Sequence, residues 1–287
     1  MILEQIVNGL GQGAIYALMS LGYALIFGVV GLVTFVHGDV IMLGAFTAYY
    51  SFAYLGGNLL LSIVLGFAVS GVMGFFIHRI CYNRFFNSPR QISLICTIGM
   101  GMFLRNLVQV VAGAESKPIP NIFGSGAVTF AGLRITYMQI FIFAVVLILV
   151  LVLTVFLNKT RVGMSLKSVS MDKTASALVG INTKWTTTMG NMIGCGLAGV
   201  AGVLLAMYYG TITPMMGGTI GMKAFCCAVL GGVSSVGGAA VGGLLIGICE
   251  NLGIMLFSAG MRDTVSFLLL ILILLIKPEG LFTRRSR

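Results

Sequence analysis

Apolar residues run along this chain in long, nearly unbroken segments. Residues 140–157 read IFIFAVVLILVLVLTVFL, and residues 267–276 read FLLLILILLI. The strands of a membrane barrel would instead alternate apolar and polar residues over about ten positions. A helix needs about 20 apolar residues to cross the hydrocarbon of a bilayer. The pattern therefore predicts an all-α integral membrane protein.

Nine apolar segments have suitable length, and we predict eight or nine transmembrane helices within a single polytopic membrane domain, 1–287. In the first two segments and in the glycine-rich stretch 211–240, a broken or re-entrant helix is an alternative to a simple crossing. The nine segments are 8–30, 38–56, 59–79, 91–112, 138–158, 188–209, 216–233, 237–258 and 262–277.

The composition excludes a soluble domain. Hydrophobic residues make up 58% of the 287 residues and charged residues only 8%, whereas a soluble domain carries about 25% charged residues. The six cysteines show no C-x-x-C spacing, so the sequence predicts neither a disulfide framework nor a metal site.

Many of the 40 glycines lie inside the apolar segments, and several stand four positions apart. This spacing lets membrane helices pack closely. Alternatively, some glycines mark broken helices that line a transport path. The pairs are Gly9 and Gly13, Gly238 and Gly242, and Gly243 and Gly247.

The net charge of +10 is explained by the excess of Lys and Arg in cytoplasmic loops rather than by nucleic-acid binding. Twelve of the 17 basic residues lie in 79–90, 159–184 and 277–287. Nine crossings place all three segments in the cytoplasm, with the C-terminus inside and the N-terminus and loop 113–137 outside. We expect a multi-pass protein of the bacterial cytoplasmic membrane.

Segment 159–187 is longer than a simple inter-helix connection. Its apolar residues, spaced among polar ones, predict one or two short amphipathic helices that stop at Gly180. Such helices either lie on the membrane surface, held by their lysines, or form a docking surface for a cytoplasmic partner.

Enzymatic chemistry is not indicated. The chain lacks the G-x-x-x-x-G-K-[ST] pattern of a P-loop, and its two histidines cannot build a metal site alone. We expect no cofactor and no catalytic residues.

Four ionisable residues within or next to apolar segments are informative, because a charge at the bilayer centre costs about 2.5–3.5 kcal/mol. His37 and Asp39 follow the first segment, and His37 either caps the next helix or lines the pathway near its cytoplasmic mouth. Lys223 and Glu250 fall on neighbouring predicted helices. We predict an ion pair between them; the alternative is that either side chain snorkels to water.

Several stretches resemble the permeases of branched-chain amino acid ABC transporters. Residues 13–46, GAIYALMSLGYALIFGVVGLVTFVHGDVIMLGAF, resemble the opening of that family. Residues 197–252, which include KAFCCAVLGG, resemble its second signature. SALVGIN at 176–182 resembles the family's cytoplasmic coupling segment, and LILLIKPEGLF resembles its usual close. The departures are Thr34 for Asn, Val36 for Ala and Ser234 for Gly.

The resemblance implies the shorter permease subunit of a high-affinity leucine, isoleucine and valine importer. Its partners would be a second homologous permease subunit, two cytoplasmic ABC ATPases that bind the ATP, and an extracytoplasmic substrate-binding protein. We place His37, Gly38, Asp39, Lys223 and Glu250 on the substrate pathway. The residues expected to couple to the ATPase are Lys167, Asp172, Lys173, Ala175, Leu178, Gly180 and Ile181.

Other functions remain open at this point. A stand-alone ion-coupled secondary transporter or channel would use Lys223 and Glu250 as its coupling site, and a scaffold subunit would not transport at all. Because the binding protein usually selects the solute, urea, short amides and other amino acids are alternative substrates.

Overall fold

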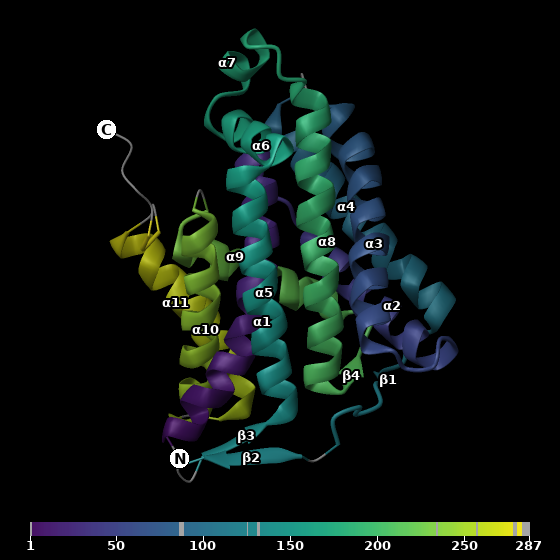
Figure 1. The fold of residues 1–287 in the computed structure, drawn as a ribbon, viewed down its shortest axis with the longest axis vertical. Coiled ribbons are helices and arrows are strands. Elements are labelled where there is room, and N and C mark those ends of the chain that lie inside the picture. Colours follow the sequence, from purple (N-terminus) through teal and green to yellow (C-terminus); the bar gives the residue numbers. More distant parts are fainter. Residues whose placement is uncertain are drawn as a thin grey trace.

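A computed structural model of the chain describes residues 2–85, 89–124, 126–130, 133–233, 235–256, 258–277 and 280–282. Most of these residues are helical, and the long helices run roughly along one axis (Figure 1). The predicted all-α class is confirmed. Ser234, the Pro278–Glu279 pair of the closing motif and the basic tail (Arg284, Arg285 and Arg287) lie outside the described residues.

Each of the nine predicted segments contains one helix. Two more short helices lie in 159–187, and a π-helix, His78–Asn83, continues α3. The helices are α1 Ile2–Val30, α2 His37–Tyr54, α3 Leu59–Ile77, α4 Arg90–Ala112, α5 Tyr137–Lys159, α6 Arg161–Met171, α7 Lys173–Leu178, α8 Thr183–Tyr209, α9 Met216–Gly231, α10 Val236–Leu256 and α11 Arg262–Ile276.

Six helices of the described chain are long and apolar enough to cross a membrane: α1, α3 with its π-helix, α4, α5, α8 and α10. Helices α9 and α11 have only 16 and 15 residues, and α2 carries His37 and Asp39 in its first turn. These three helices can still be inserted, but their length and polarity do not require a full crossing. The count of eight or nine crossings therefore stays a prediction.

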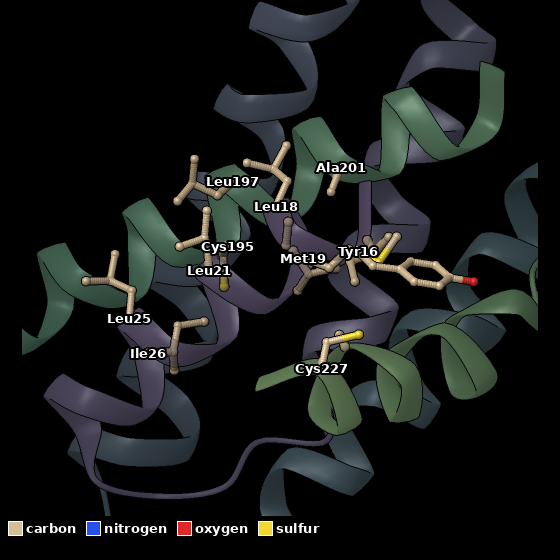
Figure 2. Packing of buried hydrophobic residues seen from close by; sticks show 14 of the residues in the cluster. Tyr16, Leu18, Met19, Leu21, Leu25, Ile26, Cys195, Leu197, Ala201 and Cys227 are labelled. Atoms are coloured by element: carbon tan, nitrogen blue, oxygen red, sulfur yellow. The ribbon is translucent and has the colours of Figure 1, made fainter. Parts of the chain in front are cut away.

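Helix α1 is buried along most of its length, between α8, α9 and α10. Apolar side chains of α1 and α8 pack together over several turns (Figure 2). Glycines bring α1 against α10: a Cβ added to Gly13 would lie 2.9 Å from the Cα of Leu244, and one added to Gly9 would lie 2.7 Å from the Cα of Ile248. The prediction that spaced glycines pack helices closely is confirmed here.

Two helices begin part-way along α1. The chain turns at Gly31 (φ 75°) and runs back, so that the His37 ring contacts the carbonyl of Met19. At 1.5 Å per residue, Met19 lies about 16 Å from the end of α1. Helix α9 begins at the same level, because the backbone of Gly221 packs against Gly38. Helices α1, α2 and α9 are each continuous, and a re-entrant course for α2 or α9 stays a prediction.

Two small antiparallel sheets, which the sequence pattern did not predict, lie at the end of the molecule where α1 begins (Figure 1). Strand β1, Lys117–Pro118, pairs with β4, Thr211–Ile212, and ties the loop after α4 to the end of α8. Strand β2, Ala127–Phe130, pairs with β3, Leu133–Thr136. The first pair has two residues per strand, which is too short to leave a periodic pattern.

Helices α6 and α7, with residues 179–182, lie at the opposite end (Figure 1); we call residues 161–182 the coupling segment. The Asp172 side chain caps α7 by accepting hydrogen bonds from the backbone N–H groups of Thr174 (2.8 Å) and Ala175 (3.0 Å). Gly180 follows α7 with φ 85°, a backbone conformation that favours glycine. The predicted short helices and their stop are confirmed.

The α1–α10 contact gives a direct test of glycine packing. We expect Gly13→Ala to destabilise the fold by about 1–3 kcal/mol, the usual cost of overpacking. Gly99→Ala is the matched control, because Gly99 is also helical but a Cβ there meets no atom within 4 Å. Thermal unfolding in mild detergent measures both variants. Equal midpoints for the two variants would contradict the close contact.

Candidate functional site

The carboxylate of Glu250 on α10 forms the core of a buried charge centre, which we call the Glu250 centre. Its Oε1 lies 2.9 Å from Nζ of Lys223 on α9. Glu250 has no exposed surface and Lys223 is 4% exposed. The predicted ion pair is therefore present, and the alternative of snorkelling side chains is wrong for both residues within this chain.

Neutral donors complete the shell of the Glu250 carboxylate. Tyr16 and Gln12 of α1 donate to Oε2 at 2.9 and 3.0 Å, and the Ser266 hydroxyl of α11 donates to Oε1. A buried charge is tolerated when its pair and its remaining hydrogen bonds are satisfied. Helices α1, α9, α10 and α11 are thereby joined at one carboxylate.

The Glu250 centre reaches the surface through α11. Lys223 also contacts Oδ1 of Asp263, at 2.7 Å, and the Asp263 side chain is 49% exposed. Beside it, Arg262 donates to the Tyr209 hydroxyl at 3.3 Å. Sequence reasoning missed Asp263 and Arg262. The signal was an adjacent pair of opposite charges at the start of the last apolar segment.

A second buried carboxylate, Asp39, lies in the first turn of α2. Arg105 of α4 binds it with two nitrogens: Nε is 2.5 Å from Oδ1 and Nη2 is 3.2 Å from Oδ2. Asp39 is almost fully buried, whereas the Arg105 side chain is 29% exposed. We call this pair the Asp39 centre. Sequence reasoning missed Arg105, although a charged residue inside segment 91–112 carried the same signal as the others.

Glycines make room for the Asp39 centre. A Cβ on Gly217 of α9 would lie 2.5 Å from Oδ1 of Asp39, and one on Gly101 of α4 would meet Oδ2. Gly38 lies against the backbone of Gly217 and Gly221. The glycines thus allow α2, α4 and α9 to converge on the carboxylate, and a side chain at any of these positions would require the helices to move apart.

His37 begins α2 but does not cap it, since no side-chain hydrogen bond is formed at that helix end. Its Nε2 lies 3.1 Å from the carbonyl oxygen of Met19, and its ring packs edge-on against Tyr23 with centroids 5.4 Å apart. A nitrogen facing a carbonyl must donate, so Nε2 carries the proton. The capping role is wrong: His37 joins α2 to α1, and its pathway role stays a hypothesis.

The five predicted pathway residues are therefore not brought into one site. Asp39 belongs to the Asp39 centre, with His37 and Gly38 beside it at the start of α2, whereas Lys223 and Glu250 belong to the Glu250 centre. Helix α9 contributes to both, through Gly217 at its start and Lys223 two turns later. A shift of α9 would consequently change the contacts of both carboxylates.

The predicted coupling residues differ in exposure. Lys173 donates to the carbonyl of Val30, the last residue of α1, at 2.6 Å. Ile181 packs partly buried against the core, whereas Leu178 is 84% exposed and its neighbour Val179, which was not predicted, is 76% exposed. Lys167 lies on α6, 3.4 Å from the Asn158 side-chain oxygen. The segment is thus anchored on one side and presents apolar side chains on the other.

Within the part of the chain that the structure describes, no group of three or more His, Cys, Asp or Glu side chains could hold a metal ion. The expectation that partner subunits bind the ATP stays a prediction.

Residues 5–275 match the family model described as branched-chain amino acid transport system / permease component. The chain belongs to this family. It is 38% identical to the high-affinity branched-chain amino acid transport system permease protein BraD of Pseudomonas aeruginosa, over 98% of this chain and 96% of that protein. It is 37% identical to LivH of Escherichia coli K12, over the same shares.

More distant proteins are also among the matches. The ribose import permease protein RbsC of Haemophilus influenzae is 22% identical over 98% of this chain and 87% of that protein. No solved structure matches the chain. The resemblance found in the sequence motifs is confirmed, and the permease is a multi-pass protein of the inner membrane.

Mutation of the Glu250 centre of this permease tests the ion pair. Lys223→Met leaves a buried carboxylate without its cation, and we expect a loss of about 3–5 kcal/mol of stability. Adding Glu250→Gln should recover part of this loss, because the amide is neutral. Lys159→Met, at an exposed lysine of α5, is the control. Thermal unfolding of the purified variants measures each effect, and strictly additive losses would contradict the pairing.

Proposed function

We propose that this permease forms half of the translocation pathway of an ABC importer for branched-chain amino acids. A second homologous permease supplies the other half, two cytoplasmic ABC ATPases drive transport, and an extracytoplasmic binding protein delivers the solute. Support comes from the family and from BraD and LivH, both of which are named as permease proteins of high-affinity branched-chain amino acid transport systems.

The exposed apolar end of the coupling segment is the observation that carries the proposal. Leu178 and Val179 are largely exposed, and α7 is the outermost element at its end of the molecule (Figure 1). A helix that lay on lipid would turn its apolar side back toward the membrane. Apolar side chains placed beyond the ends of the helices instead suit a protein partner, and we assign this partner as the ATPase.

The contacts of the coupling segment supply a route for the motion. Lys173 holds the end of α1, and the chain continues from there through residues 31–36 to the Asp39 centre. On the other side, Ile181 leads directly into α8. A displacement of α7 by the ATPases therefore reaches α1, α2 and α8, which is what alternating access requires.

The orientation follows from the same assignment. The coupling segment is cytoplasmic, so the start of α1 and the β2–β3 hairpin, at the opposite end, face the outside. The C-terminus is cytoplasmic, in agreement with the basic residues of segment 277–287. The hairpin side is then the side on which a binding protein docks.

The rival function, a stand-alone ion-coupled transporter, is not favoured by the comparisons. In the structure its coupling residue, Glu250, is already held by Lys223 and three neutral donors.

Charge placed on the coupling segment tests the proposal. We expect Leu178→Asp to reduce co-purification of the ATPase subunits at least tenfold, because a carboxylate would be buried at the interface, while the permease stays folded. Ile122→Asp is the control, since Ile122 is an exposed apolar residue between β1 and β2, at the end of the molecule opposite α7. Subunit ratios by quantitative mass spectrometry measure the effect. Unchanged ATPase recovery with Leu178→Asp would argue against docking on α7.

A further inference from the structure

Helix α4 carries a polar patch that is absent from the apolar stretch of α5. Residues 140–153 of α5 are all apolar, and many of their side chains are exposed; such a surface suits lipid. Helix α4 instead carries Arg105, Asn106 and Gln109 within one turn, none of them buried. These three residues form a polar patch on a helix whose other exposed side chains, such as Phe103 and Val110, are apolar.

The side chain of Arg105 does not extend toward the membrane surface. Its guanidinium points to Asp39, in the first turn of α2, and α2 begins part-way along α1. Charged side chains held at membrane depth face a protein partner or a water-filled cavity. The side of the molecule where α4 meets the start of α9 thus faces the pathway or the second permease, not lipid.

The guanidinium of Arg105 retains binding capacity. Its hydrogen bonds to Asp39 use Nε and Nη2, and among the described residues Nη1 has no acceptor. Gly218 lies beside this nitrogen: an added Cβ would be 3.5 Å from Nη1. Because Gly218 has no side chain to cover this edge, the guanidinium can donate hydrogen bonds to a second carboxylate. Arginine is suited to such planar binding of carboxylates.

We infer that Arg105 binds the α-carboxylate of the transported amino acid and that Asp39 receives its ammonium group. The inference rests on the proposed function and names the substrate site within it. A zwitterion can exchange with the Arg105–Asp39 pair without leaving either charge alone, because each protein charge gains a partner as the internal pair opens. A solute with one charge or none cannot do this.

Methionines flank the pair and suit an aliphatic side chain. Met102 precedes Arg105 by three residues on α4, so it lies on the face that carries Arg105. Met222 follows Gly218 by four residues on α9, so it lies on the face that borders the guanidinium. Both are exposed. Methionine adapts its shape to different apolar groups, as a site for leucine, isoleucine and valine requires.

The complete importer in proteoliposomes provides the test. With Arg105→Gln we expect ATP-driven leucine uptake to fall at least tenfold, while ATPase stimulation by the leucine-loaded binding protein stays within twofold of wild type. Arg105→Lys should restore part of the uptake at a higher KM, because lysine keeps the positive charge but cannot bind a carboxylate with two parallel N–H groups. Arg84→Gln, at an exposed arginine just after the π-helix, should change nothing.

The double variant Asp39→Asn/Arg105→Gln distinguishes a folding defect from a loss of substrate binding, because it leaves no unpaired charge. It should assemble normally and still lose uptake. If Arg105→Gln transports like wild type, or loses stimulation in step with uptake, the inference is overturned and the proposed function stands. If the wild-type complex shows no ATP-driven leucine uptake, the proposed function fails, and the inference with it.

Discussion

The backbone contact between α1 and α10 is the constraint on which the rest of the structure depends. Lipid gives apolar helices little reason to associate, so membrane helices are held by close packing and by polar contacts. Gly9 and Gly13 let α10 approach until backbone meets backbone. Helix α1 is then enclosed, and polar residues on it, such as Gln12 and Tyr16, can lie in the interior and serve the Glu250 carboxylate.

The enclosed α1 also organises the elements that can move. Helices α2 and α9 begin beside its middle, and Lys173 fastens the coupling segment to its end. Helix α9 reaches from the Asp39 centre to the Glu250 centre, so both ion pairs depend on its position. The Asp39 pair joins α2 to α4 and the Glu250 pair joins α9 to α10, so both pairs would adjust if these helices shifted between two arrangements.

Sequence reasoning predicted what depends on a single segment or on a strong local signal. The apolar runs predicted the positions of nine helices, and the isolated charges Lys223 and Glu250 predicted their ion pair. It missed partners that are neutral or distant: nothing local marks Tyr16, and Arg105 lies 66 positions from Asp39. Which faces of α2 and α4 meet depends on how residues 31–36 fold back, and this tertiary packing leaves no periodic signal.

We propose that this chain works as one subunit of an ATP-driven importer. Purification from native membranes in mild detergent, with identification of the co-purifying proteins by mass spectrometry, tests it most directly. A second homologous permease and P-loop ATPases should be recovered in a fixed ratio to this chain. Recovery of the chain alone, together with leucine transport by the chain alone in ATP-free liposomes, would contradict it.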